Sequence, residues 1–257
     1  MLSLKEIKEK LEHAVGPESW LLELENDNRV GAKKLLASWK KKQQMLMLEK
    51  QVHEDKIQFD RSFCSSEHDL VAGVDEAGRG PLAGPVVTAA VILKKNAEEL
   101  VGLNDSKQLS KAKREELAEK IKKNAVSYSI HFQSVEKIDE LNIYEATKQS
   151  MTEAVLSLSE RPTVVLVDAM ALPIDIDTHS IIKGDAQSLA IAAASILAKT
   201  ARDQYMDQLH EDFPLYLFNK HAGYGTKQHV DMIMQYGPTE HHRKTFEPVK
   251  TLLKNMR

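Results

Sequence analysis

With 257 residues, of which 42% are hydrophobic and 28% charged, the chain has the composition of an ordinary globular protein. Its net charge of −3 argues against a protein that coats nucleic acid by bulk electrostatics. The longest apolar run in a predicted helix, 189–198, is too short to cross a bilayer. The single cysteine, Cys64, has no partner for an internal disulfide, and residues 1–10 lack an apolar signal segment. We therefore expect a cytoplasmic protein.

Residues 1–66 are predicted to form a helical N-terminal extension, apart from a second domain at residues 67–257. Ser3 followed by Glu6 is typical of a capping box, and 30–63 has the pattern of one or two amphipathic helices. Six lysines and one glutamate between positions 32 and 50 give a local charge of +5. Such a patch can neutralise phosphates or can simply be a solvated helix face, and the sequence leaves both interpretations open.

The second domain begins with two apolar segments, 70–74 and 85–93, separated by a turn rich in glycine and proline; we predict two neighbouring strands. The later predicted elements are a helix at 110–125, a strand at 126–132, a helix at 139–158, strands at 163–168 and 179–183, and a long helix at 188–209. This order predicts an α/β fold, a mixed central sheet flanked by helices, with a helical C-terminal segment.

Carboxylates stand where predicted strands end or join helices. Asp75 and Glu76 follow the first strand, Asp168 ends the Val-rich strand, and Asp185 lies before the Ala-rich helix. Clustered buried anions are costly unless a cation neutralises them, and hard oxygen ligands select Mg²⁺ or Mn²⁺. Two such ions about 3.5–4 Å apart can activate water and stabilise a leaving oxygen in phosphodiester cleavage.

Each carboxylate also has a purely structural interpretation. Asp185 can be the N-cap of the following helix, Asp168 can close a turn with Ala169 and Met170, and Asp75 and Glu76 can pair with Arg79. Neighbouring side chains of a regular strand point to opposite faces, so Asp75 and Glu76 share one ion only if the backbone bends. Otherwise Glu76 contributes through its carbonyl or from the periphery.

Several ordered motifs resemble the type 2 ribonuclease H (ribonuclease HII) family. The matching segments are Val74-Asp75-Glu76-Ala77-Gly78-Arg79-Gly80-Pro81-Leu82-Ala83-Gly84-Pro85-Val86, Leu103-Asn104-Asp105-Ser106-Lys107, Val167-Asp168-Ala169, Lys183-Gly184-Asp185, Ala192-Ala193-Ala194-Ser195-Ile196-Leu197-Ala198-Lys199, Gly223-Tyr224-Gly225-Thr226 and Thr239-Glu240-His241-His242-Arg243. The resemblance extends over residues 69–249 and implies a ribonuclease H-like fold. It also implies Mg²⁺- or Mn²⁺-dependent hydrolysis of the RNA strand of RNA/DNA hybrids, leaving 3′-hydroxyl and 5′-phosphate ends, with Asp75, Glu76, Asp168 and Asp185 as the metal-binding and catalytic set.

The turn Gly78-Arg79-Gly80 is a candidate substrate-binding site, because two glycines let the backbone approach a ribose and bond its 2′-hydroxyl. The resemblance implies this use of the turn, and it implies that Tyr224 packs on the following deoxyribose. The two contacts together imply cleavage at an RNA–DNA junction, including a single ribonucleotide within duplex DNA. A plain glycine turn is the alternative. Ser106, Lys107 and Lys183 are candidate phosphate contacts, with an ordinary surface role as the alternative for each.

Three histidines and one alanine of the C-terminal segment also bear on the site. The histidines His221, His241 and His242 are not expected to bind metal. A histidine general base is also unnecessary, because a metal lowers the pKa of its bound water. Ala222 stands where the family commonly has lysine, so one phosphate contact is expected to be missing.

Two other functions compete with the nuclease interpretation. A nucleic-acid binder that lost catalysis would bind a ribonucleotide-containing duplex without nicking it. A carboxylate-pair glycosidase would stay active in EDTA.

Overall fold

The structure is a computed structural model that describes residues 2–14, 18–95, 97–103 and 109–255. The chain divides into two compact units, residues 1–52 and 53–257, and each is described by itself. The predicted substrate residues Ser106 and Lys107 lie outside the described part of the chain.

The first unit is helical, as predicted. It contains α1 (Leu4–His13), α2 (Ser19–Glu25) and the first part of α3 (Val30–Arg61). The predicted capping box is confirmed: Glu6 N–H donates to Ser3 Oγ at 3.3 Å, and Ser3 N–H donates to Glu6 Oε2 at 2.7 Å. Apolar side chains at helical spacing close a small core made of Ile7, Leu11, Leu21, Leu24, Ala32 and Leu36.

A five-stranded mixed sheet is the centre of the second unit, with the order β3-β2-β1-β4-β5. Its strands are β1 (Val71–Ala77), β2 (Val86–Leu93), β3 (Ala125–Gln133), β4 (Val164–Asp168) and β5 (Asp177–Ile181). Strands β1, β2 and β3 pair antiparallel, while β4 runs parallel to both β1 and β5. The predicted α/β fold class is therefore confirmed.

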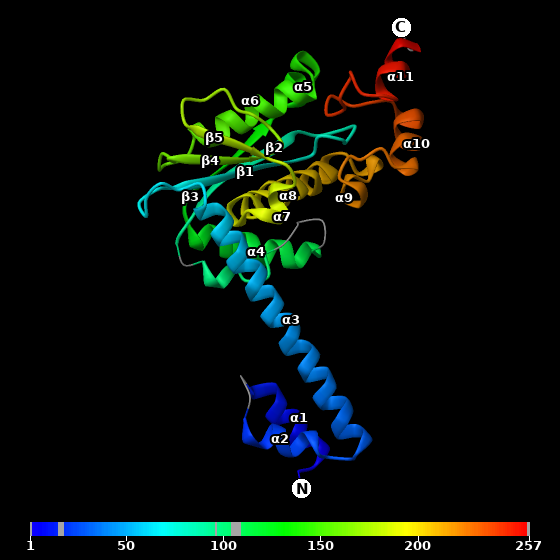
Figure 1. The fold of residues 1–257 in the computed structure, drawn as a ribbon. Helices are drawn as coiled ribbons and strands as arrows, with labels where there is room; N and C mark the ends of the chain where they lie inside the picture. Colours follow the sequence, from blue (N-terminus) through cyan, green and yellow to red (C-terminus); the bar gives the residue numbers. More distant parts are fainter. Residues whose placement is uncertain (1, 15–17, 96, 104–108, 256–257) are drawn as a thin grey trace. The chain divides into compact units, whose positions relative to one another are not determined.

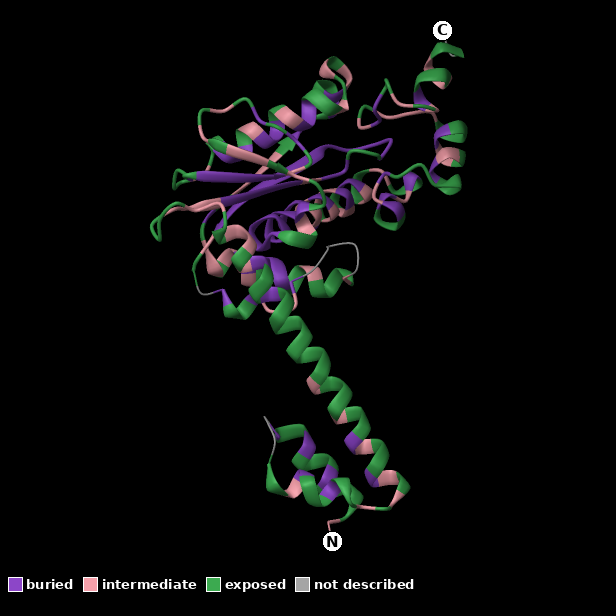
Figure 2. Ribbon diagram, in the orientation of Figure 1, coloured by how far each residue is buried: buried purple, intermediate pink, exposed green. Residues whose placement is uncertain are grey.

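Helices cover both faces of this sheet (Figure 1). On one face lies the long helix α8 (Leu189–Asp212), whose Ala-rich first half packs on β1 and β2, with α4 (Lys111–Asn124) beyond it. On the other face lies α6 (Ile143–Leu156), whose Met151, Ala154 and Val155 pack on Val74 and Val167. Figure 2 shows this buried interior, where β1, β2, β4 and the first half of α8 are mostly purple.

The predicted helix 139–158 is two helices, α5 (Val135–Leu141) and α6. Asn142 separates them with a φ of 74°, a left-handed value that a continuing α-helix does not allow. Its side-chain oxygen accepts hydrogen bonds from Tyr144 N–H at 2.9 Å and Glu145 N–H at 3.1 Å, so it caps α6.

The predicted strand 179–183 begins and ends two residues earlier, at β5. Lys183 has a φ of 55°, and a short helix, α7 (Gly184–Gln187), starts directly after it. A 3-10 helix, η1 (Glu98–Leu100), follows β2.

The C-terminal segment is helical, as predicted. It contains the 3-10 helix η3 (Pro214–Tyr216) and the helices α9 (Phe218–His221), α10 (Lys227–Tyr236) and α11 (Val249–Asn255). Its apolar side chains pack on Met206 and Leu209 of α8 and on Leu82. Among the described helices, not one has both the length and the apolar composition that a membrane crossing requires.

Candidate active site

Asp75 and Asp168 lie at the same level of two neighbouring parallel strands. Val74 of β1 is the register partner of Val167 of β4, so the next residues along the two strands are the two aspartates. Their preceding neighbours Val74 and Val167 both face α6, and the alternation of a regular strand turns both aspartates toward the α8 face. The topology thus brings together two carboxylates that are 93 residues apart in the chain.

The Asp75 carboxyl group is buried, with only 6% of the residue exposed. Its Oδ1 accepts a hydrogen bond from Glu76 N–H at 2.7 Å, and Ser195 of α8 also bonds to it. Burial raises the pKa of Asp75 well above its usual value, and the negative charges of Glu76 and Asp168 raise it further. A divalent cation at this point would relieve this cost, so the donor set fits a hard metal ion.

The alternation of side chains along a regular strand turns Glu76 away from the face that carries Asp75. Pairing between β1 and β2 continues without a shift through Asp75, Glu76 and Ala77, so the strand does not bend there. The register partner of Glu76 is Thr88, whose hydroxyl donates to the Ser150 carbonyl of α6 at 2.9 Å. Glu76 therefore lies at the margin of the Asp75–Asp168 pair, where its charge still acts on Asp75.

Gly73 of β1 has a packing role. A Cβ placed on it would lie 2.0 Å from the backbone of Ala190, so only glycine lets the start of α8 pack against β1. This close contact sets the depth at which α8 lies on the sheet.

Asp168 and Asp185 are linked through the backbone between them. Gly184 N–H donates to Asp168 Oδ1 at 2.7 Å, and Asp185 is the next residue, half-buried in α7. The carbonyl of Asp185 accepts a hydrogen bond from Lys56 Nζ at 2.8 Å, and Lys56 is only 2% exposed. Asp168 thus binds a residue 16 positions away, and the alternative of a local turn through Met170 does not describe its contact.

The alternative for Asp185, an N-cap of the long helix, is wrong. Ser188 is the N-cap of α8 and accepts from Ile191 N–H at 3.0 Å. A second N–H group in the first turn of α8 also has an acceptor: Ala190 N–H donates to Oδ2 of Asp60, in α3, at 3.0 Å. Lys56 and Asp60 carry no signal in the sequence, because nothing near them indicates contacts some 130 residues away.

Within the described residues, no three acidic, histidine or cysteine side chains lie close enough together to form a complete metal cage. The structure instead presents the Asp75–Asp168 pair on the α8 face, with Glu76 and Asp185 beside it. Two carboxylates at one level of a sheet can share the charge of a cation, and the flanking acids can complete its oxygen ligands.

Two buried arginines fix the turn after β1. Arg243 Nη2 donates to Gly78 O at 2.6 Å and its Nη1 to Arg79 O at 2.8 Å, with two further bonds to Gly84 O. Arg202 of α8 donates to Pro85 O at 3.0 Å. Burial lowers the pKa of Arg202 to about 10 and that of Arg243 to about 9, so both stay charged at neutral pH. Arg243 ends the motif at 239–243, but the motif by itself predicts no role for it.

The same turn lies against Tyr224. Gly78 has a φ of +97°, and a Cβ on Gly80 would lie 3.7 Å from Tyr224 Cε1. Leu82 N–H donates to Gly223 O at 2.8 Å, which ties the two segments together. Tyr224 remains 46% exposed, so part of the residue is accessible to a ligand. The structure thus places side by side the glycine turn and the aromatic ring that the sequence indicated separately.

The remaining predicted residues are more peripheral. Arg79 is exposed and its Nη1 lies 3.6 Å from Glu76 Oε1, while Lys183 is exposed at the start of α7. Ala222 has a φ of 48° and ends α9, and its carbonyl accepts from Arg202 Nη1 at 3.0 Å. The position is therefore used by its backbone to hold the Tyr224 loop.

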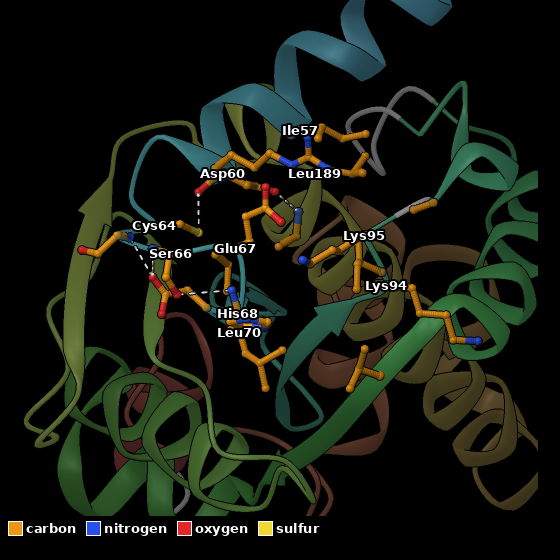
Figure 3. A pocket seen from close by; sticks show the side chains of 18 residues that line it. Ile57, Asp60, Cys64, Ser66, Glu67, His68, Leu70, Lys94, Lys95 and Leu189 are labelled. Carbon is orange, nitrogen blue, oxygen red and sulfur yellow. Dashed lines mark hydrogen bonds between the residues drawn. The ribbon is translucent and has the colours of Figure 1, made fainter.

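A hollow of about 840 Å³ lies elsewhere, at the opposite end of β1 (Figure 3). Its walls come from the end of α3, the segment 64–71, the end of β2 and the start of α8; Asp60, Cys64 and Lys94 are among the side chains around it. None of the four candidate acids lines it, so this hollow is not the candidate active site.

A mixed five-stranded sheet with carboxylates at the ends of its central parallel strands, covered by helices on both faces, defines a ribonuclease H-like nuclease. The structure is similar to the ribonuclease H2 of Pyrococcus horikoshii, with a TM-score of 0.65 and 29% identity, over 73% of this chain and 99% of that one. It is also similar to the ribonuclease HIII of a Mn²⁺ complex, at a TM-score of 0.55 and 19% identity, over 74% of this chain and 70% of that one, which supports the fold alone.

Sequence comparison identifies the family. The Ribonuclease HII family model matches residues 72–249, and that of the Ribonuclease HII N-terminal domain matches residues 3–64. The ribonuclease HII of Lactobacillus helveticus is 50% identical over 98% of this chain and 100% of that protein, and that of Bacillus licheniformis is 46% identical over 97% and 98%. The chain belongs to the ribonuclease HII family.

The family assigns the chemistry in outline. The protein is a divalent-metal-dependent endonuclease that hydrolyses RNA in RNA/DNA hybrids. This excludes the glycosidase interpretation, and it disfavours a binder without catalysis.

Proposed function

We propose that this protein nicks duplex DNA at embedded ribonucleotides and at RNA–DNA junctions, in addition to cutting longer hybrids, and leaves 3′-hydroxyl and 5′-phosphate ends. The observation that carries this proposal is the contact between the Gly78-Arg79-Gly80 turn and Tyr224, next to the strand that bears Asp75. A turn that reads a ribose beside a ring that packs on a deoxyribose selects a junction rather than a uniform hybrid.

Asp75 and Asp168 would hold the metal ions, with Asp185 as a flanking ligand and Glu76 contributing through its backbone carbonyl or from the periphery. When bound, two Mg²⁺ or Mn²⁺ ions would supply activation of water and neutralisation of the charge that develops on the phosphate. The buried Asp75, kept in place by Glu76 N–H and Ser195, provides a ligand of fixed orientation. Asp168 is held likewise by Gly184 N–H.

The chain's other groups would position the substrate. The backbone of the Gly78–Gly80 turn would bond the 2′-hydroxyl, since Arg243 donates to the carbonyls of Gly78 and Arg79 and holds that backbone in place. The exposed side chains Arg79 and Lys183, together with Ser106 and Lys107, would contact phosphates. We further propose that the protein acts as a monomer in the cytoplasm, in ribonucleotide removal and RNA primer processing.

Cleavage mapping tests this function. A labelled DNA duplex with one ribonucleotide is incubated with the protein in Mg²⁺, in Mn²⁺ and in EDTA, beside an all-DNA duplex and a continuous RNA/DNA hybrid. We expect a metal-dependent nick at the ribonucleotide and an uncut all-DNA duplex. Cutting of the long hybrid with no nick at a single ribonucleotide would refute junction selectivity, and binding with no cutting of either substrate would refute the nuclease.

A further inference from the structure

Three fully or nearly buried histidines lie beneath the loop that carries Tyr224. His229 and His242 are 0% exposed, and His221 is 9% exposed. His229 Nδ1 lies 3.0 Å from the Tyr224 carbonyl oxygen, and its Nε2 lies 3.1 Å from His242 Nε2. A chain of hydrogen bonds therefore connects the backbone of Tyr224 to His242.

Thr239, at the His242 end of these hydrogen bonds, determines which ring nitrogen donates in each of them. Thr239 N–H donates to His242 Nδ1 at 3.0 Å, so that nitrogen is an acceptor and the proton of the neutral ring is on Nε2. His242 Nε2–H then donates to His229 Nε2, which places the His229 proton on Nδ1. His229 Nδ1–H donates in turn to the Tyr224 carbonyl. One backbone N–H thus sets the tautomers of both histidines.

His221 holds the same loop from its other side. Gly223 N–H donates to His221 Nδ1 at 3.2 Å, and His221 Nε2 lies 2.9 Å from the Tyr216 carbonyl. The rings of His221 and His229 are stacked at 4.4 Å. Both ends of the segment 223–224 are therefore bonded to neutral imidazoles.

The surroundings keep these rings neutral. Burial, with a smaller contribution from nearby histidines, lowers the pKa of His229 to about 4 and that of His242 to about 3. The titratable and charged groups against the cluster are His221 of α9, His210 of α8, Tyr216 of η3, and His241 and Arg243 next to His242 in the chain. A proton on either ring of the pair would set N–H against N–H and break the chain of bonds.

We propose that His229 and His242 are positioning residues for junction selectivity: as a neutral hydrogen-bonded pair they hold the Tyr224 loop at the Gly78–Gly80 turn. This inference rests on the proposed role of Tyr224 in substrate binding. It assigns a function to His229, which no sequence motif indicated, and to His242.

The first test does not depend on activity. Nitrogen-15 NMR of the histidine rings at pH 7 distinguishes the two neutral tautomers. We expect the proton on Nδ1 in His229, the tautomer that is less common in free imidazole side chains, and on Nε2 in His242. The proton on Nε2 of His229, or a charged ring at either position, would overturn the proposal.

The second test uses two substitutions of one residue. An asparagine amide reaches the position of a histidine Nδ1, and a glutamine amide that of Nε2, because they are two and three bonds from Cβ. H229N therefore retains the donor to Tyr224, whereas H229Q retains only the contact with His242. We expect H229Q to raise KM for a single-ribonucleotide duplex about five- to thirtyfold, the equivalent of one lost hydrogen bond, with kcat within about twofold.

H229N should keep KM within about threefold of the wild-type value, and H229Q should also lose preference for the single-ribonucleotide duplex over the continuous hybrid. The matched control is H131Q. His131 lies in β3 and bonds to Ser150 Oγ at 2.8 Å on the α6 face, so H131Q should change neither KM nor the substrate preference. Equal effects of H229N and H229Q would mean that the ring only fills space, and would refute the positioning role.

These tests separate the inference from the proposed function. If wild-type protein does not discriminate between the two substrates, the junction function fails, and the tautomer measurement still decides the hydrogen-bonded pair. If discrimination is normal in wild type and unchanged in H229Q, only the inference fails.

Discussion

At the scale of single residues, the site depends on buried charges held by backbone groups. Asp75 accepts from Glu76 N–H and Asp168 from Gly184 N–H, so a backbone group helps to fix the orientation of each carboxylate. Burial, together with the negative charges of Glu76 and Asp168, raises the pKa of Asp75, so the group is a poor structural arrangement and a good cation site.

We therefore expect D75N and D168N each to lower the cleavage rate by at least ~10³, because charge stabilisation by the metal is lost. The free energy of unfolding should not fall in D75N, since a neutral amide replaces a buried anion. Single-turnover cleavage and urea unfolding check both expectations, with D177N at the exposed start of β5 as the control. Near-normal turnover in either variant would remove that residue from the site.

Arg243 is a second residue whose effect can be measured. It is 0% exposed and donates four hydrogen bonds to the carbonyls of Gly78, Arg79 and Gly84. R243K keeps the charge but not the planar fork, so we expect a loss of roughly 2–4 kcal/mol in the free energy of unfolding. Urea denaturation measures it. R161K, at an exposed arginine, should change stability by less than about 0.5 kcal/mol. Equal stability of the two variants would contradict the role of Arg243.

At the scale of elements, the N-terminus of α8 joins the sheet, α3 and the site. Ser188 caps it, Asp60 accepts from Ala190 N–H, and Gly73 lets it approach β1. The other oxygen of Asp60, Oδ1, is buried with no hydrogen-bond partner in the described part of the chain. Burial raises the pKa of Asp60 to about 6.

The raised pKa of Asp60 predicts how the stability of D60N differs from that of the wild type at each pH. The folded protein binds the Asp60 proton more tightly than the unfolded chain, so ionised Asp60 costs stability at pH 7, and the cost vanishes as pH falls from about 6 toward 4. We expect D60N to be more stable than wild type by roughly 2–3 kcal/mol at pH 7, and the difference to shrink by pH 4.5. Urea unfolding of both proteins across this range measures it. A difference that does not change with pH would contradict the ionisation.

At the scale of the whole molecule, the compact units are residues 1–52 and 53–257. The last turns of α3 belong to the second unit, because Lys56 and Asp60 bond to Asp185 and Ala190. We propose that the extension, predicted at residues 1–66, adds nonspecific affinity for duplexes. Its lysines at 33, 34, 40, 41 and 42 are exposed, and Lys40 pairs with Glu25.

Replacing these five lysines with glutamine should flatten the dependence of log Kd on log salt, because fewer counterions are released on binding. Fluorescence anisotropy with a labelled duplex at several salt concentrations measures the slope. As a control, K120Q/K122Q/K123Q alters a helix in which Lys120 and Lys122 already pair with glutamates. An unchanged slope in the five-lysine variant would rule out a role of this patch in binding.

Local physics let the sequence by itself determine most elements and the candidate residues. Alternating and continuous apolar runs predicted β1 to β4 within a few residues, and the motifs around Asp75 and Asp168 predicted the family. One predicted helix, 139–158, was wrong for a local reason. Asn142 divides it by adopting a positive φ, which the sequence of this segment does not reveal.

Tertiary structure alone decided how these residues meet. The parallel register of β1 and β4 set Asp75 beside Asp168, and regular pairing with β2 turned Glu76 away. Arg202, Arg243 and His229 had no sequence signal, because their partners are backbone carbonyls and buried rings brought close only by folding. A carbonyl is the same in every residue, so the sequence cannot show which one a buried side chain will bind.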